Sequence, residues 1–124
     1  MPHIRVECSR NLATMIDLPG LVANLYQAAM ETGVFASGSV RAFAVPCDIW
    51  ATESGPGLGV FIRIEVRVAP GRSEEIRQRI RTKLFETANA ILAPVFAEQA
   101  AALQVEVTQF DSEFSVSRNT MLAS

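Results

Sequence analysis

Residues 60–68 read Val-Phe-Ile-Arg-Ile-Glu-Val-Arg-Val, with a valine or isoleucine at every second position. An alternation of period two predicts a β-strand whose apolar side chains face a core while the others face away from it. Pro70 and Gly71 turn the chain directly after this strand. The residues that follow predict a helix, because Ser73 is a good N-cap and the glutamates at 74 and 75 suit the positive end of the helix dipole.

This predicted helix carries a single apolar stripe. The stripe consists of Ile76, Ile80, Leu84, Ala88, Ile91, Leu92, Val95 and Phe96. Pro94 lies inside the stripe and is expected to kink the helix or split it in two, because proline removes an intrahelical hydrogen bond. Residues 103–109 predict a last strand, since their apolar residues alternate again, and residues 114–116 continue a weaker alternation.

The first half of the chain repeats this order of elements. Residues 3–8 alternate and predict a strand. The helix that follows is expected to begin after Asp17, with a proline in its first turn, and to stop at Gly33. Residues 39–50 predict a second extended segment, and the glycine-rich residues 52–59 predict a turn.

The chain therefore reads strand, helix, strand, and then strand, helix, strand again. This order predicts an α/β protein with one domain over residues 1–124, whose halves cover approximately 1–59 and 60–124. Each half is a βαβ unit, and together they form a four-stranded mixed sheet. Because each helix is apolar along one stripe only, both helices are expected on one face of the sheet.

Composition excludes several classes of protein. The chain has 124 residues, 49% of them hydrophobic, which is rich for a small monomer and favours an oligomer. A net charge of −2 argues against nucleic-acid binding. We expect no membrane span and no signal peptide. Cys8 and Cys47 form neither a disulfide framework nor a metal-binding spacing. We expect both to be small buried hydrophobic residues. Together these features favour a cytoplasmic protein without a metal or cofactor.

Pro2 stands directly behind the initiator Met1, and we expect aminopeptidase to remove the methionine. The mature chain would then begin with a secondary amine, held by the strand that follows and on the same side as the apolar residues of that strand. Such an amine is both a base and a nucleophile. The alternative is that the proline has no chemical role, since Met-Pro openings are common.

Several short motifs, in the same order along the chain, resemble the 5-carboxymethyl-2-hydroxymuconate isomerase family of the tautomerase superfamily. They are Met-Pro-His-Ile-Arg-Val-Glu-Cys-Ser at 1–9, Asp-Leu-Pro-Gly-Leu at 17–21, Thr-Gly-Val-Phe at 32–35, Val-Arg at 40–41, Asp-Ile-Trp at 48–50 and Gly-Arg-Ser at 71–73. The resemblance spans nearly the whole chain and weakens after about residue 110. Pro46, Cys47 and the glycines of 52–59 depart from the family pattern.

The resemblance implies an isomerase that converts 5-carboxymethyl-2-hydroxymuconate, a dienol with three carboxylates, into an unsaturated ketone during homoprotocatechuate catabolism. Pro2 would be the general base, and its pKa would be lowered by burial and by nearby cations. Arg41 and Arg72 would bind substrate carboxylates and stabilise the enolate, since the planar guanidinium holds a carboxylate with two hydrogen bonds. The resemblance further implies a cytoplasmic homotrimer with active sites near the subunit boundaries.

Phe43 and Trp50 are candidates for the walls of the substrate pocket, although ordinary packing explains them equally well. His3 is expected to be a solvated or interface histidine, and Arg5 and Glu7 are each expected to pair with neighbours across the sheet. Two other functions stay open. One is a tautomerase, hydratase or dehalogenase acting on a smaller 2-oxo or acrylate acid. The other is a trimeric binding protein without catalysis.

Overall fold

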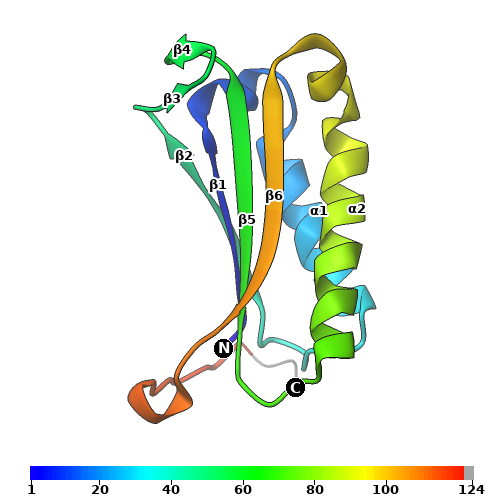
Figure 1. Ribbon diagram of the computed structural model, residues 1–124. Helices are drawn as coiled ribbons and strands as arrows, with labels where there is room; N and C mark the ends of the chain where they lie inside the picture. The colour runs from blue at the N-terminus through cyan, green and yellow to red at the C-terminus, as the bar shows by residue number, and fades with distance from the viewer. Residues whose placement is uncertain (122–124) are drawn as a thin grey trace.

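The computed structural model describes residues 1–121 as two layers, a sheet and a pair of helices (Figure 1). The strands are β1 (His3–Ser9), β2 (Arg41–Cys47), β3 (Ala51–Thr52), β4 (Gly55–Pro56), β5 (Val60–Val68) and β6 (Ala101–Gln109). The helices are α1 (Leu18–Glu31) and α2 (Glu74–Glu98), with short 3-10 helices at Arg10–Thr14 and Ser112–Phe114.

The main sheet contains four strands in the order β2-β1-β5-β6. Strands β1 and β2 are parallel, as are β5 and β6, so each half of the chain forms a βαβ unit. The two central strands, β1 and β5, run antiparallel and join the units. The sheet is therefore mixed, as the order of elements predicts.

Both helices cover the same face of this sheet (Figure 1), and the core lies between the two layers. The predicted alternation of β5 is confirmed, because its five valines and isoleucines are all buried. The opposite face carries the charged residues of β1 and β5 and has no helix over it. We call it the open face.

The helix ends form where the capping residues predict them. The side chain of Asp17 accepts a hydrogen bond from the backbone N–H of Gly20 (3.1 Å), and α1 stops just before Gly33, whose φ is +75°. The hydroxyl of Ser73 accepts a hydrogen bond from the N–H of Ile76 (3.2 Å). These bonds satisfy N–H groups that have no partner within the helix.

Substituting Ser73 by alanine tests this cap. We expect Ser73→Ala to lower the free energy of unfolding by about 1 kcal/mol, since the first turn of α2 loses its acceptor. Denaturant unfolding at a fixed protein concentration measures the change. Ser54→Ala is the matched control, because this exposed hydroxyl makes no hydrogen bond within residues 1–121 and its loss is expected to be neutral. Equal stabilities for the two variants would contradict the prediction.

The expectation that Pro94 could split the second helix is wrong, since α2 runs unbroken from Glu74 to Glu98. Pro94 lies in the last turns of the helix and on its exposed side. The carbonyl that loses its intrahelical partner belongs to Ala90, which is also exposed. Water can bond that carbonyl, so the cost of proline is smaller here than in a buried helix.

Other differences lie at the edges of the sheet. Strand β2 is shorter than the predicted segment 39–50, and it includes Pro46, which an edge strand tolerates because one side of it forms no ladder. Strand β6 starts two residues earlier than expected. The turn 52–59 contains the small β3–β4 hairpin. Cys8 is buried, but the expectation of a buried Cys47 is wrong, because that residue is only partly covered on the edge strand.

Within residues 1–121, none of the helices combines the length and apolar character needed to cross a membrane.

Candidate active site

Three sequence-predicted residues lie at one end of the sheet, where β1 and β2 begin and β5 ends. We call this the Pro2 end. The amino terminus, the segment between α1 and β2, and the turn between β5 and α2 all meet there (Figure 1). Pro2 precedes β1, Arg41 is the first residue of β2, and Arg72 lies in the turn after β5. The topology alone thus brings these residues to one end of the molecule.

Pro2 is buried, on the same side of the strand as Ile4. Its carbonyl accepts a hydrogen bond from the backbone N–H of Arg41 (3.1 Å), which fixes the amino terminus to β2. The structure includes Met1, so the nitrogen of Pro2 is here an amide. Removal of Met1 would turn it into a secondary amine at the end of an ordered strand.

The guanidinium of Arg41 lies beside the amino terminus. Nη1 donates hydrogen bonds to the carbonyls of Gly38 (2.8 Å) and Val40 (3.3 Å), and Nη2 lies 3.8 Å from the sulfur of Met1. The Gly38 carbonyl also accepts from Nδ2 of Asn119 (2.9 Å), so the C-terminal segment reaches the same place. These contacts orient the Arg41 guanidinium beside the amino terminus.

Arg72 is held by the other loops of this end. Its guanidinium donates to the carbonyls of Val34 (3.4 Å) and Ala69 (3.5 Å) and lies over the ring of Phe35, 5.1 Å from the centroid. Neither Arg41 nor Arg72 forms an ion pair with a carboxylate of residues 1–121. Both cations therefore keep their charge available to an anionic ligand.

His3 and Arg67 extend this positive region onto the open face, and the sequence pattern did not single out Arg67. In the sheet, His3 pairs with Arg41 on one side and with Arg67 on the other. Burial lowers the pKa of His3, as do the positive charges of the amino terminus, Arg67 and Arg41. His3 is thus a neutral imidazole at neutral pH, surrounded by cations.

The two aromatic candidates lie at opposite ends of β2. Phe43 is on the open face close to the Pro2 end, with its ring 6.2 Å from that of His3 in an edge-on arrangement. Trp50 follows the far end of β2, where its indole N–H donates to the carbonyl of Leu58 (3.1 Å). A strand of seven residues spans about 20 Å. The structure therefore does not bring Trp50 to Pro2 within one chain.

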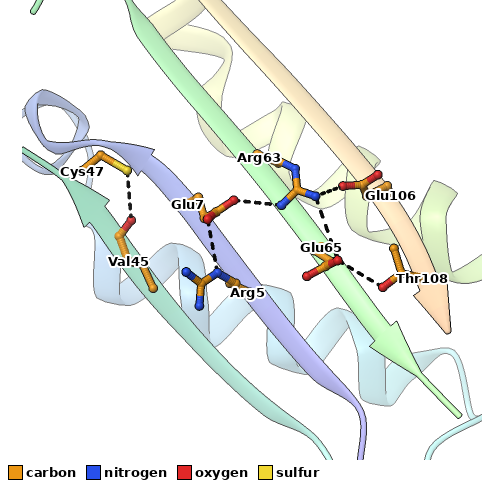
Figure 2. Close-up of polar contacts among 8 residues, drawn as sticks. All are labelled: Arg5, Glu7, Val45, Cys47, Arg63, Glu65, Glu106 and Thr108. Atoms are coloured by element: carbon orange, nitrogen blue, oxygen red, sulfur yellow. Dashed lines mark hydrogen bonds and ion pairs between the residues drawn. The ribbon is translucent and has the colours of Figure 1, made fainter. Parts of the chain in front are cut away.

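The middle of the open face carries a network of charged side chains from β1, β5 and β6 (Figure 2). Arg63 contacts three carboxylates, those of Glu7 (2.8 Å), Glu65 (4.0 Å) and Glu106. The expected pairing across the sheet is confirmed for Glu7, which meets Arg63 of β5, whereas Arg5 pairs with Glu7 of its own strand (3.3 Å). The arginines of this network are neutralised by their neighbours, in contrast to those at the Pro2 end.

This network makes stability depend on pH. The Arg63 guanidinium, which hydrogen-bonds Glu7, holds the pKa of that carboxyl below its usual value. A carboxyl with a lowered folded-state pKa stabilises the fold above its unfolded-state pKa and loses this effect as the pH falls through the folded-state value. We expect Glu7→Gln to lower Tm by up to about 4 °C near pH 7.

The difference from the wild type is expected to shrink as the pH falls below about 4, where the carboxyl becomes protonated. Thermal unfolding followed from about pH 7 to about pH 3 measures it. Glu53→Gln, at an exposed residue without an ion pair in the described part of the chain, is the control. A Tm difference that stayed constant over this range would contradict the assignment.

Comparison with known proteins identifies the family. The model of the family described as 5-carboxymethyl-2-hydroxymuconate isomerase matches residues 2–124. The chain belongs to this family. It is accordingly an isomerase, and the resemblance carried by its short motifs is confirmed.

Individual relatives support membership of the 5-carboxymethyl-2-hydroxymuconate isomerase family. The chain is 29% identical over 123 residues to the 5-carboxymethyl-2-hydroxymuconate Delta-isomerase of Escherichia coli, covering 99% of this chain and 98% of that protein. It is 25% identical to the crystal structure of a 5-carboxymethyl-2-hydroxymuconate isomerase from Deinococcus radiodurans R1, with a TM-score of 0.88, covering 97% and 90% of the two chains.

The same fold occurs in more distant solved structures. A symmetric trimer of a fused 4-OT protein matches with a TM-score of 0.67 at 13% identity, covering 94% of this chain and 93% of that one. At this identity the match shows the fold alone, and it confirms the predicted four-stranded mixed sheet with two helices.

Proposed function

We propose that this protein isomerises 5-carboxymethyl-2-hydroxymuconate to its unsaturated ketone, with the amine of Pro2 as the general base. The observation that carries the proposal is the position of the Arg41 guanidinium beside the amino terminus, at the same end of the sheet as Arg72. Family membership indicates the substrate, because two bacterial relatives are described as isomerases of 5-carboxymethyl-2-hydroxymuconate. The reaction belongs to homoprotocatechuate catabolism.

The reaction needs a proton to move from an oxygen to a distant carbon. The neutral amine of Pro2 takes the proton of the 2-hydroxyl, the O–H electrons form the ketone, and the π electrons shift along the diene. The terminal carbon of the diene then takes the proton back from the Pro2 ammonium, so the base is regenerated. A base that both takes and returns a proton works best when its pKa lies near the pH of the reaction.

Positive side chains around the amine favour its neutral form, and they also favour a negative substrate. In this proposal Arg41 binds a carboxylate and stabilises the negative charge that develops on the enolate oxygen, while Arg72 binds a second carboxylate. Phe43 contributes an apolar wall on the open face. A role for Trp50 would require a neighbouring copy of the chain, because in its own subunit the indole lies at the far end of β2.

We further propose that the protein is a homotrimer whose open faces pack around a threefold axis, with the Pro2 end of each sheet at a boundary between subunits. The open face has no helix over it, and a protein of the same fold is a symmetric trimer. Light scattering after size exclusion tests the oligomeric state. We propose that the protein is located in the cytoplasm, because Cys8 and Cys47 are free thiols.

The experiment that tests the function is turnover of 5-carboxymethyl-2-hydroxymuconate followed by ultraviolet absorbance. It uses wild-type protein whose intact mass shows that Met1 has been removed. Fast turnover supports the proposal. Absence of turnover by folded protein lacking Met1 would reject this substrate, and a panel of smaller 2-oxo acids would then separate another tautomerase from a binding protein.

A further inference from the structure

We propose that Arg67 binds the carboxymethyl group of the substrate and makes the enzyme selective for a tricarboxylate over a dicarboxylate. The inference rests on the proposed function, in which Arg41 and Arg72 take two of the three carboxylates. It names the residue that takes the third.

The position of Arg67 in the sheet supports this role. Arg67 is the direct neighbour of His3 across the pair of antiparallel strands, and Arg41 is the neighbour of His3 on the other side. Neighbouring strands lie about 4.8 Å apart, so the backbones of Arg41 and Arg67 are separated by about 10 Å with His3 between them. Their side chains stand on the same open face. Two guanidinium groups that flank one residue in this way suit an extended molecule with carboxylates at separate points.

Arg67 also lies in the same electrostatic surroundings as the amino terminus. The positive charges of the terminus, of Arg67 and of Arg41 all act on the imidazole of His3. The nitrogen of Pro2 lies at the very end of β1, next to His3, at the end of the sheet that the proposed trimer leaves at a subunit boundary. A substrate bound there would lie within reach of Arg67 as well.

Arg67 is held in place without being neutralised. Its guanidinium lies over the ring of Phe110, 5.3 Å from the centroid, and the N–H of Phe110 donates to the carbonyl of Val68 (3.0 Å). No carboxylate in residues 1–121 pairs with it. Stacking on an aromatic ring orients the planar group while leaving its N–H donors free.

The contrast with the other arginines of the open face supports the choice. Arg63 is surrounded by Glu7, Glu65 and Glu106, and Arg5 is paired with Glu7, so neither offers a free charge to a ligand. Arg41 and Arg72 are held by backbone carbonyls of the loops between α1 and β2 and between β5 and α2. Of the two arginines that flank His3 in the sheet, Arg41 is on β2 and Arg67 is on β5.

The test compares two substrates in the same variant. Steady-state kinetics of Arg67→Gln are measured with 5-carboxymethyl-2-hydroxymuconate and with 2-hydroxymuconate, the same dienol without the carboxymethyl group. We expect KM for the tricarboxylate to rise about tenfold or more, because a charge-assisted pair of hydrogen bonds is lost, while KM for the dicarboxylate changes less than about twofold. Arg67→Lys keeps the charge but not the planar group. Its KM for the tricarboxylate is expected to lie between those of the wild type and Arg67→Gln.

Arg79→Gln is the matched control, since it removes one positive charge from an exposed position on α2. It is expected to leave both KM values unchanged, which separates a specific contact from the general effect of net charge. Equal changes for the two substrates in Arg67→Gln would overturn the proposal. So would loss of the oligomer in that variant, measured by light scattering, because Arg67 would then belong to the contact between copies.

Calorimetric titration distinguishes failure of this inference from failure of the proposed function. If the wild type turns over neither dienol, the proposed function fails. Binding of propane-1,2,3-tricarboxylate and of glutarate is then compared in the wild type and in Arg67→Gln. Selective weakening of the tricarboxylate, by about tenfold, keeps Arg67 as the residue that recognises a third carboxylate. Equal weakening of both acids, or no binding by the wild type, overturns the inference.

Discussion

Replacing Pro2 by alanine is expected to lower kcat/KM by about 10²- to 10⁴-fold, the range that positioned general bases contribute. The variant begins with a primary amine, which is less basic than the secondary amine of proline. It also loses the ring that prevents rotation about the N–Cα bond, so the lone pair of the nitrogen is no longer held in one orientation. Ultraviolet-monitored turnover at several pH values measures both effects.

The fold of Pro2→Ala is expected to be kept, because the contact between the amino terminus and β2 uses the backbone carbonyl of residue 2 and the N–H of Arg41. Unfolding curves and intact mass are the controls for folding and for removal of Met1. A preparation that retains Met1 provides a second comparison, since its proline nitrogen is an amide and cannot accept a proton. Full activity in either protein would exclude Pro2 as the base.

Arg41→Ala is expected to lower kcat/KM by about 10²- to 10³-fold, the typical cost of removing one donor that stabilises a developing oxyanion. Because the guanidinium lies beside the amino terminus, it is the cation best placed to contact both the substrate and the charge formed after proton transfer. The effect should appear in kcat as well as in KM. A change in KM alone would mean that Arg41 binds the ground state and the transition state equally well.

The matched control for Arg41→Ala is Arg79→Ala, which removes the same side chain from an exposed position on α2. Pairing of β1 with β2 is expected to survive in Arg41→Ala, since the backbone N–H of residue 41 still donates to Pro2. Arg41→Lys keeps the charge but presents no planar pair of donors, so partial activity is expected. Unchanged kcat/KM in Arg41→Ala would remove this residue from the proposed mechanism.

Most of the fold could be predicted from the sequence because its signals are local. The alternation over 60–68 identifies a strand and its buried face, and a capping residue such as Asp17 or Ser73 bonds an N–H only three residues away. The error at Pro94 has a physical reason, since the cost of a proline depends on whether the freed carbonyl meets water or a core. That depends on which side of the helix is covered, and local sequence does not report it.

Some residues of the candidate site could likewise be predicted from the sequence, and others could not. Pro2, Arg41 and Arg72 lie in the short motifs that resemble those of the family, so the sequence alone indicates them. Trp50 lies in such a motif too, yet β2 carries it to the far end of the sheet. Arg67 has no motif, and its position became apparent only from its pairing with His3, which lies far away along the chain.

The sequence by itself determined the elements, their order and the chemistry available, because period, capping and residue type act over a few neighbours. Only the tertiary structure decided which of these groups meet. The register of β1 with β2 and β5 places Arg41 and Arg67 on either side of His3, and the antiparallel joining of the two units brings the turn with Arg72 to the amino terminus. Such contacts depend on pairing between strands distant in sequence, so the core as a whole fixes them.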